Sequence, residues 1–364
     1  MKTIFIATSK FGNPISDYYK VLGKVFSENK VNIVFIFDGT PSSLPKPSNY
    51  IKYYSWPSKR PTKIKDFIFI LSLLKKYRPI LSISNFGSTN VMTLASLLTR
   101  VPNRVNYVHT TTTQINLDSK RKLSNHFFRI RKKYIYKLNT HLITNSEGTK
   151  DDTSLNFKIP KKRITVFPLL IKSSRLNYLA NKEREEQIVI VGRLDTSKGH
   201  FALIEQFSKC LKKFPRLKLK IIGDGPLQDE LYKLVSDLDM QDRVIFAGRI
   251  PNIDIDKEFS RSLISISSSV DEAFGLVNIE ALREGTPIVC TKTAGTKDIL
   301  VSQKNGMFYN VNEVMSLSNA IDEVLSNWSK YSNNSLRIFD EKYCIEKVIN
   351  THCDMITSLF LNEF

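Results

Sequence analysis

The chain has 364 residues, of which 41% are hydrophobic, and it carries a formal net charge of +19. This length exceeds one typical core and predicts two domains. The longest apolar run is shorter than a membrane span and interrupted by charges, and the four cysteines form neither a CxxC pair nor a His/Cys cluster. These features argue against a membrane-spanning protein, a disulfide framework and a zinc site. No signal-peptide pattern precedes the first strand-like run, so we expect a cytoplasmic protein.

The first half of the chain alternates β-branched and aromatic runs with helical periodicity. We expect strands at 2–8, 31–38, 80–83, 104–110 and 140–145, and a helix at 89–98. Such alternation predicts a mostly parallel sheet covered by helices. The apolar pattern is lost at about residue 173, so we expect an N-terminal acceptor-side domain over 1–172 and a linker over 173–186.

The second half repeats this rhythm. We expect strands at 187–191, 218–222, 244–247 and 263–267, with helices at 199–214 and 227–238. This predicts a second doubly wound domain over 187–335, followed by a helical segment over 336–364 that packs back on the N-terminal domain. The predicted fold class is α/β, with two Rossmann-like domains facing across a cleft.

The segment after the strand at 187–191 reads GRLDTSKG and leads directly into a helix. Amide groups at a helix start favour a diphosphate, and Arg193 and Lys198 add two cations. The alternative is a loop with two solvated cations. A second strand ends in the turn GDGP, which by itself indicates only a turn that needs glycine.

Two glutamates, Glu272 and Glu280, are separated by seven residues in the segment EAFGLVNIE. If a helix begins near Gly275, the amides of Gly275, Leu276 and Val277 can receive phosphate oxygens. Glu280, one turn further, can accept hydrogen bonds from two ribose hydroxyls, and Glu272 can accept from sugar hydroxyls. The alternative is a pair of surface glutamates near a helix N-terminus.

Taken together, GRL-x3-KG, IIGDGP and the E-x7-E element resemble glycosyltransferase family 4, across the whole second half and in the family's order. The resemblance implies the two-domain type B fold, a nucleotide diphosphate-sugar bound mainly by the C-terminal domain, and an acceptor bound mainly by the N-terminal domain. It also implies retention at the anomeric carbon, with no metal and no cofactor besides the nucleotide-sugar.

The resemblance also implies roles for single residues. The catalytic set is Glu272, Arg193, Lys198 and His109, and the donor-binding set is Gly12, Arg249, Ile250, Phe274, Gly275, Leu276, Val277 and Glu280. His109 follows a strand, and a merely polar strand-end histidine is an equal alternative. The sequence departs from the family at two places. The loop after the first strand has the single glycine Gly12 where the family has a pair, and Asp298 stands where the family more often has a glutamate.

The string Asp254-Ile255-Asp256 has the form of a metal-binding DxD motif. It precedes a polar helix start, so we interpret it as a helix N-cap. We therefore predict no metal ligands in the chain.

Residues 119–137 contain many Lys and Arg and no acidic residue, with Leu123, Phe127, Ile130 and Tyr134 at helical spacing. A basic amphipathic helix of this kind can lie on an anionic membrane. The alternative is a helix that packs its apolar stripe on the fold and is basic outside, and part of the stripe is expected to serve the fold in either case. We hypothesise a peripheral protein on the cytoplasmic face of the membrane.

The function predicted from the sequence is transfer of a hexose or N-acetylhexosamine, with a UDP-sugar favoured as donor, to a growing cell-surface polysaccharide or lipid-linked glycan, as in lipopolysaccharide or capsule biosynthesis. One alternative is a nucleotide-sugar epimerase on the same fold. A nucleic-acid-binding protein is a weaker alternative, because the chain has no aromatic-basic RNA signature, zinc finger or helix-turn-helix pattern. We expect no nucleic-acid partner.

Overall fold

The computed structural model describes residues 2–9, 13–39, 44–118, 122–174, 176, 179–180 and 183–361. It divides the chain into two compact units. Unit 1 comprises Met1–Lys172 and Cys344–Phe364, and unit 2 comprises Ser173–Tyr343. Each unit is described by itself.

Unit 1 is built on a parallel sheet in the order β3-β2-β1-β4-β5-β6-β7. Its strands are β1 (Thr3–Thr8), β2 (Asn32–Phe37), β3 (Ile51–Ser55), β4 (Leu81–Asn85), β5 (Asn103–Val108), β6 (His141–Thr144) and β7 (Ile164–Val166). The strands are apolar along most of their length because helices cover both faces. The strand order reverses between β1 and β4.

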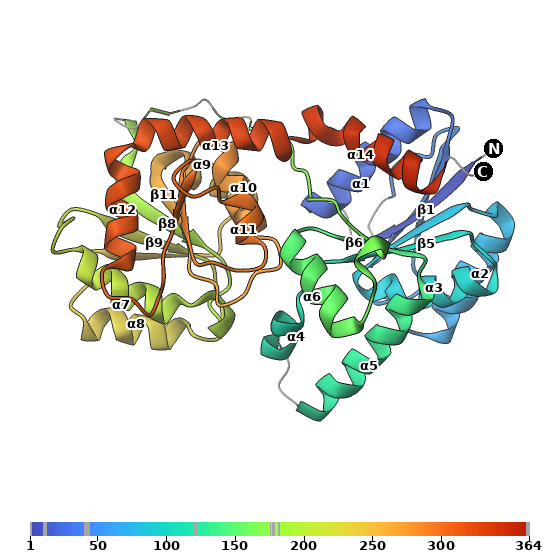
Figure 1. Cartoon of the computed structure of the whole chain (residues 1–364), viewed down its shortest axis with the longest axis horizontal. Coiled ribbons are helices and arrows are strands. Elements are labelled where there is room, and N and C mark those ends of the chain that lie inside the picture. Colours follow the sequence, from blue (N-terminus) through green and yellow to red (C-terminus); the bar gives the residue numbers. More distant parts are fainter. Residues whose placement is uncertain are drawn as a thin grey trace. The chain divides into compact units, whose positions relative to one another are not determined.

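The helices of unit 1 form two layers (Figure 1). They are α1 (Pro14–Glu28), α2 (Ile64–Tyr77), α3 (Thr89–Leu98), α4 (Thr112–Asp118), α5 (Lys122–Leu138), α6 (Glu147–Phe157) and α14 (Ile345–Phe360). α1 and α14 lie side by side, while α3 packs between α2 and α5. Asn13 caps α1 by accepting from the Ser16 amide at 2.9 Å, and Pro14 suits the first helical position.

Unit 2 repeats this architecture with the sheet order β10-β9-β8-β11-β12-β13. Its strands are β8 (Glu185–Val191), β9 (Lys218–Ile222), β10 (Val244–Gly248), β11 (Ser262–Ser267), β12 (Ile288–Cys290) and β13 (Gly306–Phe308). Its helices are α7 (His200–Cys210), α8 (Gln228–Asp237), α9 (Asn252–Arg261), α10 (Leu276–Arg283), α11 (Thr296–Ile299), α12 (Ser316–Ser326) and α13 (Trp328–Lys342). α7 and α8 lie on one face of the sheet, and α9, α10 and α13 lie on the other (Figure 1). The order reverses between β8 and β11.

The observed boundaries differ from the expected ones at two places. β8 begins at Glu185, inside the expected linker. The chain re-enters unit 1 at Cys344 and not at 336, because α13 packs on α10 within unit 2. The return is fixed by a bridge between Ile171 and Cys344, where the Ile345 amide donates to the Ile171 carbonyl at 2.9 Å.

Three of the four apolar residues singled out on α5 are exposed. Phe127, Ile130 and Tyr134, expected to serve the fold at least in part, are exposed, with 70% of Phe127 and 62% of Tyr134 accessible. The buried stripe instead includes Ile135 and Tyr136. Residues 127, 130 and 134 share the helix with this second apolar set, which is offset from them by one position. Leu123 lies in the part of α5 whose side chains the structure does not describe.

Arg184 joins several segments of unit 2 at the start of β8. Its buried guanidinium stacks on the Trp328 ring, 4.8 Å from the ring centroid. It donates hydrogen bonds to the Leu179, Phe259, Ser262 and Glu284 carbonyls and to the Thr286 hydroxyl. One side chain thereby satisfies backbone carbonyl groups before or at the start of β8, β11 and β12.

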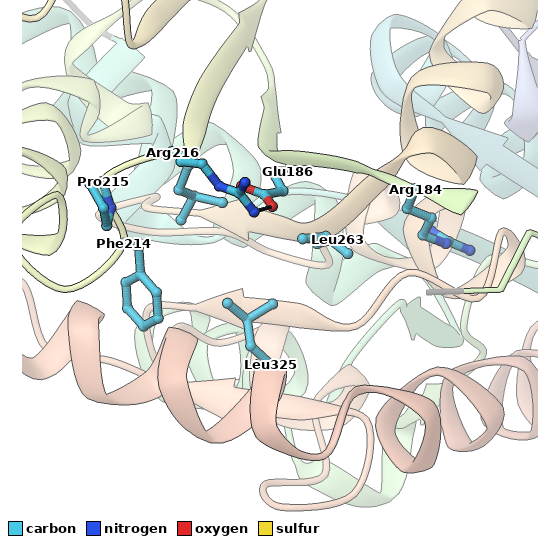
Figure 2. Close-up of a pocket in the computed structure, with 8 residues that line it drawn as sticks. Arg184, Glu186, Phe214, Pro215, Arg216, Leu263 and Leu325 are labelled. Atoms are coloured by element: carbon cyan, nitrogen blue, oxygen red, sulfur yellow. Dashed lines mark hydrogen bonds and ion pairs between the residues drawn. The ribbon is translucent and has the colours of Figure 1, made fainter. Parts of the chain in front are cut away.

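Arg184 also lines a hollow of about 580 Å³ in unit 2 with Phe214, Leu263 and Leu325 (Figure 2). Arg216 and Glu186 form an exposed ion pair in the same hollow. Among the described residues, no helix combines the length and the apolar character needed to cross a membrane.

His352 fastens α14 to unit 1, and its burial predicts acid sensitivity. Its Nδ1 lies 3.0 Å from the Tyr18 hydroxyl, and the Phe167 ring packs edge-on against it. Burial lowers the pKa of His352 from 6.5 to about 4. The unfolded chain therefore binds the proton more readily, so stability present above pH 6.5 is lost as the pH falls towards 4, by about 3 kcal/mol for this group.

Urea unfolding at pH 7.5 and pH 5.0 measures about 2 kcal/mol of this loss, and His352→Asn should reduce it. Other buried histidines, such as His141, titrate in the same direction and remain in both proteins. An equal loss of stability in wild type and variant would contradict the assignment to His352.

Candidate active site

Two adjoining hollows lie at the carboxyl ends of the unit 2 strands. The larger, about 380 Å³, is lined by Val191, Gly192, Arg193, Ile222, Gly223, Asp224, Arg249, Ile250, Asn252 and Ile255. The smaller, about 130 Å³, is lined by Ile190, Val191, Gly192, Lys198, Ile266, Ser267, Ser269, Glu272, Gly275, Leu276, Val277 and Asn278. They meet at the end of β8, beside the point where the strand order reverses. Ligands of doubly wound sheets bind at this edge.

The loop after β8 is held by its own side chains. The Asp195 carboxylate accepts from the amide of Ser197 at 3.0 Å and from its hydroxyl at 2.6 Å, which starts the 3-10 turn Thr196–Lys198. Arg193 stays 73% exposed, with Nε 3.6 Å from Asp195. The loop thus places Lys198 on the smaller hollow and Arg193 on the larger one.

The turn GDGP after β9 supports this loop. The Leu194 amide donates to the Asp224 carbonyl at 2.9 Å. Gly223 has φ +141°, and a Cβ there would lie 1.9 Å from the Gly192 carbonyl oxygen. Only glycine permits this approach of the two turns, so the motif has the structural role that we expected.

Lys198 and Glu272 meet in the smaller hollow. Lys198 Nζ lies 2.5 Å from Glu272 Oε2, and the two side chains are 27% and 23% exposed. The Ser268 hydroxyl donates to the Lys198 carbonyl at 2.6 Å, and the Gly295 amide donates to the Glu272 carbonyl at 2.7 Å. Both loops are therefore fixed by backbone bonds, and the pair is a charged, partly desolvated contact.

α10 begins at this pair. Gly275 is its N-cap, with φ +93°, and a Cβ there would lie 2.9 Å from Asn278 Nδ2. Leu276 and Val277, the first residues of the helix, line the smaller hollow. The first amides of a helix have no partner inside it, so they are available to an anion. The Phe274 side chain is buried outside both linings, with its ring edge-on to Tyr343.

Glu280 is half-buried one turn into α10, outside the two linings. Burial raises the pKa of Glu280 to about 7, with Arg283 opposing this rise and Asp256 adding to it. Among the residues that the structure describes, no hydrogen bond reaches its carboxylate. Half of the Glu280 carboxyl groups are therefore neutral near physiological pH.

The two aspartates of the DxD string lie inside α9, which starts after Pro251. The N-cap interpretation is wrong because the helix begins earlier than its polar segment suggested. Asp254 pairs with Lys257 at 2.9 Å, and Asp256 pairs with Arg283. Arg249 and Ile250, which precede α9, line the larger hollow together with Asn252.

His109 lies in unit 1, directly after β5. Its Nε2 is 2.8 Å from Asn85 Oδ1, and its ring stacks between Phe86 and Tyr107 at centroid distances of 4.3 and 4.4 Å. Burial, together with the Lys132 charge, lowers the pKa of His109 to about 3. The imidazole is neutral at pH 7. Gly12, the remaining expected site residue, lies outside the described residues.

The sequence interpretation did not include the small polar residues of the two hollows. Ser267 and Ser269 line the smaller hollow, and Asp224 and Asn252 line the larger one. Ser267 ends β11, Ser269 and Asp224 lie two residues after the ends of β11 and β9, and Asn252 begins α9. Their position at or shortly after the carboxyl ends of predicted strands is the signal that identifies them.

Comparisons with known proteins agree with this geometry. Residues 176–337 match the family described as Glycosyl transferases group 1. An uncharacterized glycosyltransferase of Methanocaldococcus jannaschii is 28% identical over 223 residues, 57% of each chain. The poly(glycerol-phosphate) alpha-glucosyltransferase of Bacillus subtilis is 31% identical over 158 residues, 43% of this chain and 23% of that protein.

A third relative, the N-acetylgalactosamine-N,N'-diacetylbacillosaminyl-diphospho-undecaprenol 4-alpha-N-acetylgalactosaminyltransferase of Campylobacter jejuni, is 28% identical over 188 residues, 50% of each chain. The matches with M. jannaschii and C. jejuni proteins thus span about half of the relatives' length.

Solved structures share the fold over the whole chain. Sucrose-phosphate synthase of Thermosynechococcus elongatus aligns with a TM-score of 0.76 at 18% identity, covering 99% of both chains. HepE of Anabaena, in complex with UDP and glucose, aligns with a TM-score of 0.75 at 15% identity, covering 99% of this chain and 100% of that one. Residues 176–337 thus resemble the glycosyl transferases group 1 family, and the chain has the two-domain type B glycosyltransferase fold.

Proposed function

We propose that this protein is a retaining, metal-independent glycosyltransferase that transfers a hexose or N-acetylhexosamine from a UDP-sugar to a cell-surface or lipid-linked glycan. The observation that carries this proposal is the Lys198–Glu272 pair at the start of α10, beside a larger hollow lined by Arg249 and Ile250. These groups lie where the strand order of the sheet reverses. A cation and the first amides of a helix can bind a diphosphate, and a carboxylate can accept hydrogen bonds from the hydroxyls of the attached sugar. The larger hollow suits the base.

The chemical step follows from these groups. Arg193, Lys198 and the first amides of α10 bind the diphosphate and stabilise the charge that develops as the bond from the anomeric carbon to phosphate oxygen breaks. In this proposal they take the part that a divalent cation plays elsewhere. The acceptor hydroxyl forms the new bond on the same face and gives its proton to the leaving phosphate oxygen. Glu272 holds hydroxyls of the transferred sugar, and no protein general base is needed.

The proposed ribose contact of Glu280 predicts a pH dependence of donor affinity. Only the ionised carboxylate accepts from both ribose hydroxyls, and its pKa is raised to about 7. UDP-glucose should therefore bind about tenfold more weakly at pH 6 than at pH 8, because about one tenth of the carboxyl groups is ionised one unit below the pKa.

Isothermal titration calorimetry checks this, and UDP-glucose is the suitable probe because it has no terminal phosphate that titrates near pH 6. Glu280→Gln should bind weakly and without this slope. An affinity of wild type that stays constant from pH 6 to pH 8, or an unchanged slope in Glu280→Gln, would remove the ribose assignment.

The acceptor proposal rests on the relatives' names and on charge. The relative from B. subtilis is named for poly(glycerol-phosphate), and the one from C. jejuni is named for a diphospho-undecaprenol glycan. Each name describes an acceptor that carries phosphate. With a net charge of +19, this protein suits an acceptor of the same class, so we propose a phosphate-bearing, lipid-linked glycan.

We further propose that unit 1 binds the anionic surface of the membrane through α5. Phe127, Ile130 and Tyr134 are exposed on a helix that also exposes Arg131 and Lys137. Apolar side chains that insert at the headgroup boundary, together with cations worth about 1 kcal/mol each, give peripheral binding. α3, which packs on α5, adds exposed leucines, including Leu98. A cytoplasmic, peripheral location follows from this proposal.

Sedimentation with vesicles that contain phosphatidylserine checks the membrane proposal. Wild type should sediment at low salt, and Phe127→Ser with Tyr134→Ser should lose most of this binding. Leu155→Ser is the matched control, because Leu155 is 79% exposed on α6 and outside the α5 stripe. No sedimentation of wild type, or equal losses in the control, would reject the docking face.

A further inference from the structure

The side chain of Asn85 joins three elements at the carboxyl edge of the unit 1 sheet. Asn85 ends β4, is 1% exposed and lies beside β1, where the strand order reverses. Its Nδ2 donates to the Ala7 carbonyl of β1 at 2.9 Å. Its Oδ1 lies 3.2 Å from the Tyr19 hydroxyl of α1 and 2.8 Å from His109 Nε2. Doubly wound sheets bind ligands at such a reversal.

These contacts determine which nitrogen of His109 carries the proton. An amide nitrogen only donates and an amide oxygen only accepts, and the Ala7 carbonyl needs a donor. The reversed amide would place its oxygen against that carbonyl, so Asn85 keeps Oδ1 towards His109, and Nε2 is the donor. Since burial is the main cause that lowers the pKa of His109 to about 3, the ring is neutral at pH 7. Its Nδ1 is therefore an unprotonated acceptor.

The plane of the His109 ring is fixed as well. The ring stacks between Phe86 and Tyr107, at centroid distances of 4.3 and 4.4 Å. Phe86 follows Asn85 directly and has φ +49°, which is rare for a bulky residue. The Ser88 hydroxyl donates to the Asn85 carbonyl at 2.6 Å and holds this turn. Backbone strain of this kind occurs mostly at functional sites, so the turn itself points to a ligand.

The second nitrogen of His109 is available to a substrate. No hydrogen bond or ion pair reaches Nδ1 from the residues that the structure describes. His109 is half-buried and directly follows β5, at the same edge of the sheet as Asn85. A neutral acceptor suits a sugar hydroxyl, which donates, and it does not suit a phosphate oxygen, which only accepts when it is ionised.

We infer that Asn85 is a positioning residue, which holds the Nε2 proton of His109 so that Nδ1 accepts a hydrogen bond from a hydroxyl of a sugar substrate. The inference rests on the proposed function. Within it, His109 has the role of a neutral acceptor, and Asn85 maintains that role without touching the substrate.

The proton position is tested by ¹⁵N NMR of the full chain with labelled histidines at pH 7.5, without substrate. The chain has five histidines, and the signals of His109 are those that His109→Ala removes. Wild type should show His109 protonated at Nε2 and unprotonated at Nδ1. Asn85→Ala removes the acceptor of the Nε2 proton, so both nitrogen signals should move towards those of exchanging tautomers. The wild-type spectrum decides the tautomer even where Asn85→Ala lowers the stability.

Asn139→Ala is the matched control for a loss of stability. Asn139 is a buried asparagine of unit 1, 2% exposed, and its amide nitrogen donates to the Ile135 carbonyl at 2.8 Å. It precedes β6 and so lies at the opposite edge of the sheet from His109. The control removes an equally buried amide and should leave the signals of His109 unchanged.

The role of the held proton is tested by the rate of UDP release from UDP-glucose in the presence of an acceptor extract. Asn85→Ala and His109→Ala should each lower this rate about tenfold, as expected for the loss of one hydrogen bond in the transition state. The double variant should be no slower than His109→Ala, because Asn85 acts through that ring. Asn139→Ala should keep the rate within about twofold of wild type.

Three results would overturn the inference: a wild-type His109 protonated at Nδ1, identical His109 signals in wild type and Asn85→Ala, or losses of rate that add up in the double variant. An equal loss of rate in Asn139→Ala would also contradict it. The spectra are recorded without substrate, so failure of the proposed function, seen as no release of UDP by wild type, is recognised separately.

Discussion

Lys198→Met and Glu272→Ala are each expected to lower the rate of sugar transfer about 100-fold or more while the chain remains folded. Lys198 stabilises charge that develops on the leaving diphosphate, and loss of one such preorganised contact typically costs this much in kcat. The stability change should stay below about 1 kcal/mol, because each partner of the ion pair is about one quarter exposed. Release of UDP from UDP-glucose in the presence of an acceptor extract measures the rate.

The exposed pair of Arg216 and Glu186 offers a matched control (Figure 2). Arg216→Met removes a cation from the same unit, in a hollow that shares no residue with either hollow of the candidate active site. It should retain wild-type turnover. Wild-type rates in both Lys198→Met and Glu272→Ala would exclude the proposed roles.

Arg184→Met should destabilise unit 2 by about 3 kcal/mol or more. The variant leaves several buried carbonyl groups without a donor, and each such group costs about 1–3 kcal/mol. For a unit of this size a loss of 3 kcal/mol lowers the melting temperature by roughly 6–12 °C. Differential scanning calorimetry of the full chain measures the shift.

Arg216→Met is again the control, because Arg216 lines the same hollow as Arg184 but is 80% exposed. It should change the free energy of unfolding by less than about 0.5 kcal/mol. Equal melting temperatures for Arg184→Met and wild type would contradict the view that this guanidinium joins the segments before β8, β11 and β12.

Hydrophobic periodicity was sufficient to predict the two parallel sheets, because buried strands are continuous apolar runs. β9 (Lys218–Ile222) and α3 (Thr89–Leu98) have the expected bounds. The three-residue strands β7, β12 and β13 were not predicted, because so short a run has no measurable period. The start of α9 was placed too late because its first turn is polar and lacks a capping side chain.

The candidate site was predictable only in part. Sequence patterns place Lys198, Gly275 and Glu272 after strands, but the contact between Lys198 and Glu272 joins residues 74 apart and depends on how β8 and β11 pair. The raised pKa of Glu280 depends on burial beside α9, which no local pattern encodes.

A thermal-shift panel of nucleoside diphosphates and their sugars tests the central claim most directly, since a ligand that binds the native state raises its melting temperature. We predict that UDP and a UDP-sugar stabilise the full chain, and that Lys198→Met and Glu280→Gln lose most of this shift while Arg216→Met keeps it. A chain that no nucleoside diphosphate or nucleotide-sugar stabilises, or one whose shift is unchanged in both site variants, would contradict the account.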